Sequence, residues 1–250
     1  MALSVMTAAD ILLAVCMFLG AVLYTSVGHG GASAYLALMA IFGIPPTVMR
    51  PTALVMNVVV STFVSGRFVK AGLFRWRALW PFLIGALPFA ILGGAIQLPG
   101  HFYKPLVGVI LWLAAARLLW PREIKADQEA HDPPVLFAAL IGAGIGLLSG
   151  LTGTGGGIFL SPVLLFACWS NTKTASGIAS VFILLNSIAG LGGNLASLHS
   201  LPPMLPLYAG SALAGALVGT TFGIRFESPW IQKALGLVLV VAGFKLMGFF

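Results

Sequence analysis

Two glycine clusters are the stretches of this chain whose residues could do chemistry. They read Gly28-His29-Gly30-Gly31 and Gly153-Thr154-Gly155-Gly156-Gly157. Glycine adopts positive φ without a steric penalty, so such a cluster lets the backbone leave helical geometry and present its N–H groups. Each cluster precedes a short apolar run, and the N-terminus of a helix attracts negative charge. The clusters therefore predict a binding site for an anion, and close helix packing is the alternative use of these glycines.

Polar side chains next to the clusters could complete the hydrogen bonds of an oxyanion. Thr152 directly precedes the second cluster, and Asn57 and Asn186 lie inside apolar runs, where an amide needs a partner. Each of these side chains could equally bond to a neighbouring helix. His29 could bind the anion or carry a proton, because imidazole titrates near neutral pH, and a neutral histidine bonded to a carbonyl is the alternative. All four are included among the predicted ligands.

Two basic residues lie just beyond the short apolar runs that follow the clusters. Arg50, between two prolines, starts the third run, and Lys173 has a roughly corresponding place in the second half of the chain. A guanidinium offers a planar fork of donors that matches sulfonate or carboxylate oxygens. Both residues are interpreted as entry charges for an anion, with anchoring at the membrane interface as the alternative. The predicted substrate site consists of Gly28, His29, Gly30, Gly31, Arg50, Asn57, Thr152, Gly153, Thr154, Gly155, Gly156, Gly157 and Asn186.

The positions of the acidic residues argue against other kinds of site. Asp10 is the only acid near an apolar run, and four of the six acids lie between residues 123 and 132. Carriers of cations and most proton relays place carboxylates inside the membrane. No group of His, Cys, Asp and Glu has the spacing of metal ligands, and the runs offer no acid to orient a histidine in a hydrolytic triad. We therefore predict a small anionic substrate and no metal, cofactor or catalytic residue.

The composition places the chain in a lipid bilayer. Hydrophobic residues make up 59% of the 250 residues, charged residues make up 8%, and the mean hydropathy is +1.04. A soluble domain carries about 25% charged residues, because its surface faces water. The net charge of +7 comes from residues gathered in short loops, as on the cytoplasmic side of membrane proteins, so no nucleic-acid partner is predicted.

Ten apolar segments are predicted to be membrane helices. A helix needs about 20 apolar residues to cross the hydrocarbon core. The second and seventh segments are shorter and follow the glycine clusters, as discontinuous helices in transporter binding sites do, and whether they cross the membrane fully is open. The segments lie at 9–27, 31–44, 51–68, 78–97, 103–120, 134–150, 155–169, 175–194, 203–224 and 229–248.

The distribution of Lys and Arg predicts the orientation of these segments. If the loop at 66–78 is cytoplasmic, ten of the thirteen basic residues lie inside, and the remaining three are Arg50, Lys104 and Lys245. Both termini are then outside the cytoplasm, and the loop at 121–133 is inside. We predict a multi-pass protein of the inner membrane.

An internal repeat divides the chain into two halves. An offset of 125 residues places the first glycine cluster on the second and pairs Gly85 with Gly210 and Gly94 with Gly219. We predict an all-α membrane protein with a first half at 1–120, a connecting loop at 121–133 and a second half at 134–250. Because each half has five segments, an odd number, the halves must be inverted in the membrane, a plan that transporters use around a central site.

The second glycine cluster also carries a family resemblance. The stretch from Gly150 to Val163, in which Pro162 follows the glycines, resembles the signature of the TauE/SafE family of membrane transporters. The first cluster departs from that signature, because Ala32 and Ala37 replace the last glycine and the proline. The resemblance implies transport, often export, of sulfite or organosulfonates. A carrier that works by alternating access is the leading interpretation; an anion channel of the same fold and a noncatalytic membrane subunit are the alternatives, and homo-oligomer formation is open.

Overall fold

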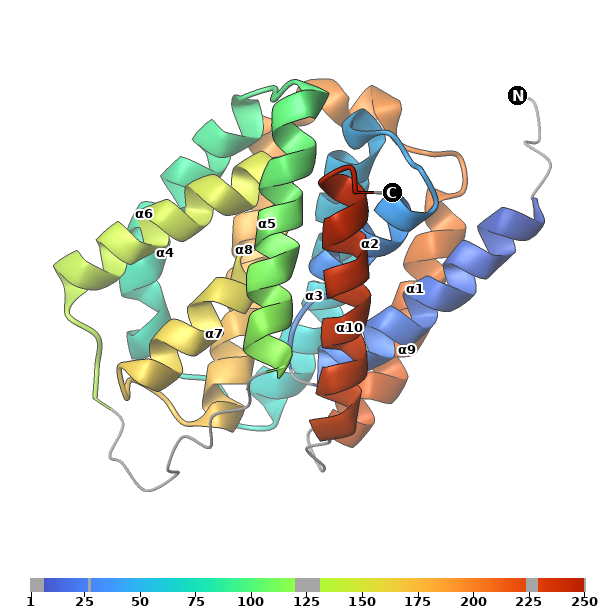
Figure 1. The fold of residues 1–250 in the computed structure, drawn as a ribbon. Coiled ribbons are helices and arrows are strands. Elements are labelled where there is room, and N and C mark those ends of the chain that lie inside the picture. The colour runs from blue at the N-terminus through green and yellow to red at the C-terminus, as the bar shows by residue number, and fades with distance from the viewer. Residues whose placement is uncertain (1–6, 27, 120–130, 224–228, 250) are drawn as a thin grey trace.

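Helices form all the regular secondary structure in the described part of the chain. The computed structural model describes residues 7–26, 28–119, 131–223 and 229–249, and Figure 1 shows how the helices are arranged. The helices are α1 (Ala8–Ser26), α2 (Ala32–Ile41), α3 (Pro46–Lys70), α4 (Trp76–Ala95), α5 (Gly100–Leu119), α6 (Val135–Thr152), α7 (Gly157–Phe166), α8 (Thr172–Gly193), the 3-10 helix η1 (Leu195–Ser200), α9 (Leu205–Gly223) and α10 (Pro229–Leu246). Five of them, α1, α3, α4, α6 and α8, are long and apolar enough to cross a membrane. The prediction of an all-α polytopic membrane protein is confirmed.

Each of the ten predicted segments coincides with one of the α-helices described, and the largest difference is at α3. This helix begins at Pro46, whereas the sequence predicted a start at residue 51. Proline is tolerated at the first position of a helix, because the N–H that it lacks would have no helical partner there. At the other end, α3 continues to Lys70, and positive charge in a last turn is favourable. The loop predicted at 66–78 is therefore shorter and runs from 71 to 75.

Many large apolar side chains lie on the outer surface of the helix bundle. Leu136 and Phe137 of α6 are 73% and 65% exposed, and Leu12 of α1 and Leu113 of α5 are also exposed. Lipid tails accommodate such side chains, whereas water does not. The buried apolar side chains form two clusters, one mainly from α1, α2, α3, α5, α9 and α10, the other from α4, α6, α7 and α8.

Glycines let two pairs of helices approach closely. Helix α6 packs in parallel against α4, and α9 packs in parallel against α1. A side chain at any of five glycines would overlap a backbone carbonyl of the partner helix, so these glycines serve close helix packing. The five are Gly142, Gly146 and Gly150 of α6 and Gly215 and Gly219 of α9. Gly223 continues the four-residue spacing of Gly215 and Gly219 in α9, and its packing lies outside what the structure describes.

The two longest helices of the bundle, α3 and α8, cross in its centre. Asn57 of α3 is hydrogen-bonded to Ser187 of α8, and Phe68, later in α3, lies beside Gly177, earlier in α8. The helices therefore run antiparallel. Under the repeat offset of 125 residues, α8 is the counterpart of α3.

The last helices of the two halves, α5 and α10, are also antiparallel neighbours. Gly108 lies beside Met247, and Leu119 lies beside Gly236. Figure 1 shows the two helices side by side, with α5 ending at the end of the bundle where α10 begins. Antiparallel counterparts are what inverted halves require. The inversion of the two halves across a membrane, and the division at residues 121–133, stay predictions.

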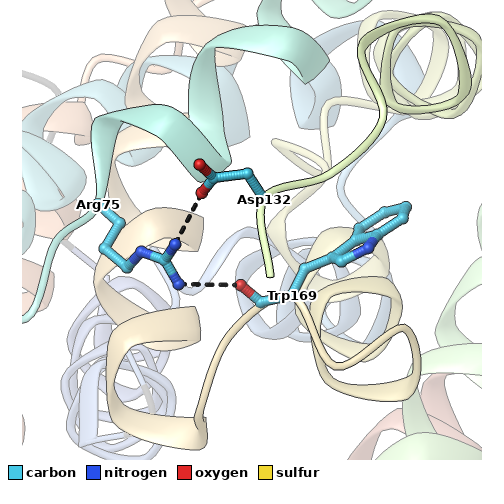
Figure 2. Close-up of polar contacts among 3 residues, drawn as sticks. All are labelled: Arg75, Asp132 and Trp169. Atoms are coloured by element: carbon cyan, nitrogen blue, oxygen red, sulfur yellow. Dashed lines mark hydrogen bonds and ion pairs between the residues drawn. The ribbon is translucent and has the colours of Figure 1, made fainter. Parts of the chain in front are cut away.

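One ion pair brings three loop segments together at an end of the bundle. Arg75, just before α4, lies 2.7 Å from a carboxylate oxygen of Asp132 and donates a hydrogen bond of 3.5 Å to the Trp169 carbonyl (Figure 2). Asp132 precedes α6, and Trp169 follows α7. The loop after α3 and the end of the connecting loop therefore lie on the same side of the molecule. The sequence predicted one side for both loops, and that this side is cytoplasmic stays a prediction.

Candidate functional site

The two glycine clusters form the turns that precede α2 and α7. Gly31 at φ +94° is the residue before α2, and Gly156 at φ +79° is the residue before α7. Gly28 and Gly153 also have positive φ, at +76° and +85°. The predicted departure from helical geometry at these glycines is confirmed, because positive φ is open to glycine and costs an L side chain about 1–2 kcal/mol. Their use in binding an anion stays a prediction.

The helices that follow the clusters match one another at both ends. Each has ten residues, and their first residues, Ala32 and Gly157, are separated by the repeat offset. Just after the helices, Gly43 and Cys168 occupy equivalent positions with φ +74° and +56°. The internal repeat that the sequence predicts is therefore present in the backbone of these two segments.

The clusters meet at one amide, the side chain of Asn57 on α3. A Cβ placed on Gly30 would lie 2.8 Å from Oδ1 of Asn57, and a Cβ placed on Gly155 would overlap its Nδ2. Ile183 of α8 lies between the clusters in the same way, at 3.1 Å from the first position and 2.9 Å from the second. The structure thus places the middle glycine of each cluster at the crossing of α3 and α8.

Both glycine turns next to this meeting point contain backbone donors. The first N–H groups of a helix have no acceptor within the helix. The backbone N–H groups of Gly31–Ser33 before and within α2, and of Gly155–Ile158 before and within α7, have no backbone acceptor among the described residues. The positive ends of two helix dipoles therefore adjoin one amide, which is an arrangement that favours an anion.

Several buried polar atoms near the clusters also lack a partner among the described residues. They include Oδ1 of Asn57, Oγ of Ser61, Oγ of Ser149, Oδ1 of Asn186 and the Tyr35 hydroxyl beside Gly31, all in side chains that are 0% exposed. Nδ2 of Asn186 donates to the carbonyl of Gly155 at 3.4 Å. A buried polar atom without a partner costs about 1–3 kcal/mol, so these atoms are candidates for contact with a ligand.

His29 connects the first cluster to the helix of the second. Its Nε2 lies 3.2 Å from Oγ of Ser161 on α7, and its ring contacts the edge of Tyr24 with centroids 6.4 Å apart. The histidine is half-buried. This position links the two halves of the repeat, and the predicted roles in anion binding or proton transfer stay predictions.

The outer glycines of the clusters pack against the long helix of the other half. A Cβ on Gly28 would lie 2.8 Å from the Ser176 carbonyl oxygen on α8, and one on Gly153 would lie 3.0 Å from the Arg50 carbonyl oxygen on α3. Each half therefore holds the glycine turn of the other half in place. Gly157 contacts Ile183 and lies closer to the meeting point.

The two predicted threonines form hydrogen bonds with partners other than Asn57. Thr152 Oγ1 donates to the Leu148 carbonyl at 2.7 Å and lies 3.1 Å from Thr154 Oγ1. The Thr152 carbonyl accepts a 2.9 Å hydrogen bond from the hydroxyl of Tyr103 on α5. These contacts fix the end of α6, from which the second cluster departs.

Arg50 is not the exposed entry charge that the sequence suggested. It is 4% exposed, its Nη1 donates to the Ile96 carbonyl at 2.8 Å, and its Nη2 donates to the carbonyls of Gly93, at 2.8 Å, and Gly94. Because α3 starts at Pro46, Arg50 lies inside the helix and faces the carboxyl-terminal end of α4. Its guanidinium caps carbonyls that have no partner in their own helix. Lys173, in the first turn of α8, is exposed.

Sequence reasoning missed three residues at the meeting point, namely Ser61, Ile183 and Ser187. Ser61 lies four residues after Asn57, so the two side chains share a helix face, and this spacing was a usable signal. Ser187 follows Asn186 directly. Ile183 gave no signal, because an isoleucine in an apolar run reads as lipid-facing or core.

Among the described residues, no group of three or more His, Cys, Asp or Glu could hold a metal ion.

Comparisons with known proteins point to transport. Residues 12–246 match the family model described as "Sulfite exporter TauE/SafE". The chain is 38% identical over 239 residues to "Probable membrane transporter protein y4hK" of Sinorhizobium fredii, with 94% of this chain and 97% of the relative covered. It is 27% identical over 250 residues to "Probable membrane transporter protein YjnA" of Bacillus subtilis, with 92% and 96% covered. No solved structure matches the chain.

Proposed function

Because the chain belongs to the sulfite exporter TauE/SafE family of membrane transporters, we propose that it carries small sulfur oxyanions, such as sulfite or organosulfonates, across the inner membrane. The observation that supports this proposal most is the meeting of two glycine turns and two helix N-termini at Asn57. In this proposal the anion binds between the turns and leaves toward the outside.

The charges near the site favour an anion over a cation. The turns beside Asn57 contain N–H groups without a backbone acceptor among the described residues, and they lead into the positive ends of α2 and α7. The described residues contain two acids, Asp10 and Asp132. Asp10 lies in the first turn of α1, bonded to Thr7 and Tyr208, and Asp132 lies in a loop. A cation at the crossing of α3 and α8 would therefore meet no described carboxylate.

The way the halves interlock suits alternating access. Each glycine turn is held by the long helix of the other half, through the contacts of Gly28 with Ser176 and of Gly153 with Arg50. A tilt of one half against the other would then move both turns around Asn57 at once. Such a motion opens the site to one side of the membrane or to the other.

Flux of labelled sulfite into liposomes that contain the purified protein tests the proposal. We expect saturable flux that an organosulfonate inhibits, and loss of this flux in Gly155→Ala. Gly144→Ala is the matched control, because Gly144 lies in α6 with open space around it. Flux of sodium or an amine without flux of any oxyanion would contradict the proposal, and flux that does not saturate would indicate a channel of the same fold.

A further inference from the structure

The binding site carries acceptors as well as donors, and this bears on the form of the substrate. The donors are the hydroxyl of Ser61 and those N–H groups of the two glycine turns that have no backbone acceptor in the described part of the chain. The acceptors are the side-chain oxygens of Asn57 and Asn186, which are buried and have no donor among the described residues.

The orientation of the Asn186 amide follows from its partner. Its Nδ2 faces the carbonyl oxygen of Gly155 at 3.4 Å. A carbonyl can only accept, so the NH2 group of Asn186 must be the side that faces Gly155. The Oδ1 atom then faces elsewhere and has no partner.

The Asn57 amide presents a second oxygen, on the side of the first glycine turn. Its Nδ2 donates to Oγ of Ser187 at 3.3 Å, and Nδ2 also adjoins Gly155. Its Oδ1 points to the side of Gly30 and has no partner. Both amides thus contact Gly155 through nitrogen and leave an oxygen unpaired.

A fully deprotonated oxyanion would satisfy only part of this site. It presents lone pairs alone, which suit the N–H groups but repel the two amide oxygens. An oxyanion that carries its own O–H group can accept from the turns and donate to an amide oxygen. We infer that the site is built for an oxyanion with one hydrogen-bond donor of its own, such as hydrogen sulfite or a hydroxyl-bearing sulfonate. This inference rests on the proposed function.

A bound cation is a poorer explanation of the unpaired oxygens. Amide and hydroxyl oxygens are ligands that sodium accepts, but the positive ends of α2 and α7 adjoin the same atoms. A hydroxyl-bearing anion satisfies one of the oxygens and the helix ends together. Sites that bind a substrate hydroxyl reject the analogue without it strongly, by about 10⁴-fold or more in the best cases.

Two sulfonates of equal charge and similar size provide the test. Inhibition of labelled sulfite flux by 2-hydroxyethanesulfonate is compared with inhibition by ethanesulfonate, which lacks the hydroxyl group. In the unmodified protein we expect the hydroxyl-bearing compound to inhibit at a concentration at least about tenfold lower. Equal inhibition by both would overturn the inference and leave the proposed function standing. Absence of sulfite flux and of inhibition by either compound would overturn both.

Two variants assign the discrimination to particular atoms. Asn186→Leu replaces the amide, and with it the acceptor oxygen, by an apolar side chain of similar size. This change should bring the ratio of the two inhibitory concentrations close to one. Ser61→Ala removes a donor, and it should weaken both compounds by a similar factor and keep the ratio. If Asn186→Leu does not fold, the ratio in the unmodified protein decides by itself. A ratio that a folded Asn186→Leu variant keeps would overturn the assignment to its amide oxygen.

Discussion

The side-chain nitrogen of Asn57 lies 3.3 Å from the hydroxyl oxygen of Ser187, and this contact joins α3 to α8 where both glycine turns reach them. The two residues come from opposite halves of the repeat. A polar contact across the centre of a membrane protein has a cost unless it serves binding or specific packing. The predictions below separate these two uses.

Asn57→Leu should remove transport and leave the fold intact. Leucine has a similar size, and the change eliminates an unpaired buried oxygen together with one long hydrogen bond. We expect the free energy of unfolding to change by less than about 1 kcal/mol, while sulfite flux falls at least about tenfold. Thermal unfolding in detergent and liposome flux measure the two effects.

Asn194→Leu is the matched control for this change. Asn194 is also buried, but its Oδ1 accepts hydrogen bonds from Gln97 and Ser197. Its loss should lower stability by about 1 kcal/mol and leave flux per folded molecule unchanged. The reverse pattern, in which Asn57→Leu keeps its flux and loses stability, would show that Asn57 serves packing only.

Cys168→Gly should stabilise the protein. Cys168 is the only residue other than glycine with positive φ in the described part of the chain, and Gly43 holds the equivalent position after α2. Glycine relieves the strain of this helix-ending turn, with an expected gain of about 0.5–1 kcal/mol in unfolding free energy. The reciprocal change, Gly43→Ala, should lower stability by a similar amount. Unfolding temperatures of the two variants check the pair, and a loss of stability in Cys168→Gly would contradict the assignment.

Arg50→Met should act on stability and not on the salt dependence of transport. It would leave the carbonyls of Gly93, Gly94 and Ile96 without their guanidinium partner, and we expect a loss of about 2–3 kcal/mol. Lys173→Gln changes an exposed charge, so it should leave stability unchanged and weaken transport mainly at low salt. Titration of the apparent affinity against ionic strength distinguishes the two, and a salt effect in the Arg50 variant alone would restore its role as an entry charge.

A cysteine at Ala71, in a background without native cysteines, should be labelled only from the cytoplasmic side. Ala71 is exposed in the loop after α3, and that loop lies at the same end as Asp132. The excess of basic residues on this side predicts its orientation. Labelling by an impermeant reagent from outside intact cells would reverse the predicted topology.

Hydropathy predicted all ten α-helices, because a bilayer requires long apolar segments whatever their tertiary contacts. Hydropathy misplaced the start of α3, because Pro45 and Pro46 were interpreted as part of a loop. Proline also begins helices, and α3 begins at Pro46. The positive φ values at Gly28, Gly31, Gly153, Gly155 and Gly156 were also accessible, because clustered glycines in an apolar chain have few other uses.

The contacts of the site were less accessible from the sequence. Arg50 caps a helix end that lies 43 to 46 residues away, so no local pattern could show its partners. Asn57 could be named as an amide in need of a partner, but its place between Gly30 and Gly155 depends on the crossing of α3 and α8. That crossing is a property of the packed bundle.

The location of a bound anion tests the central claim most directly. Selenite has the shape and charge of sulfite, and selenium gives an anomalous diffraction signal. In crystals grown with selenite, one selenium peak should lie within hydrogen-bonding reach of Asn57 and of the turns at Gly30 and Gly155, and it should be absent in Asn57→Leu crystals. A selenium peak only at exposed basic residues such as Lys173, with none between the two glycine turns, would contradict the account.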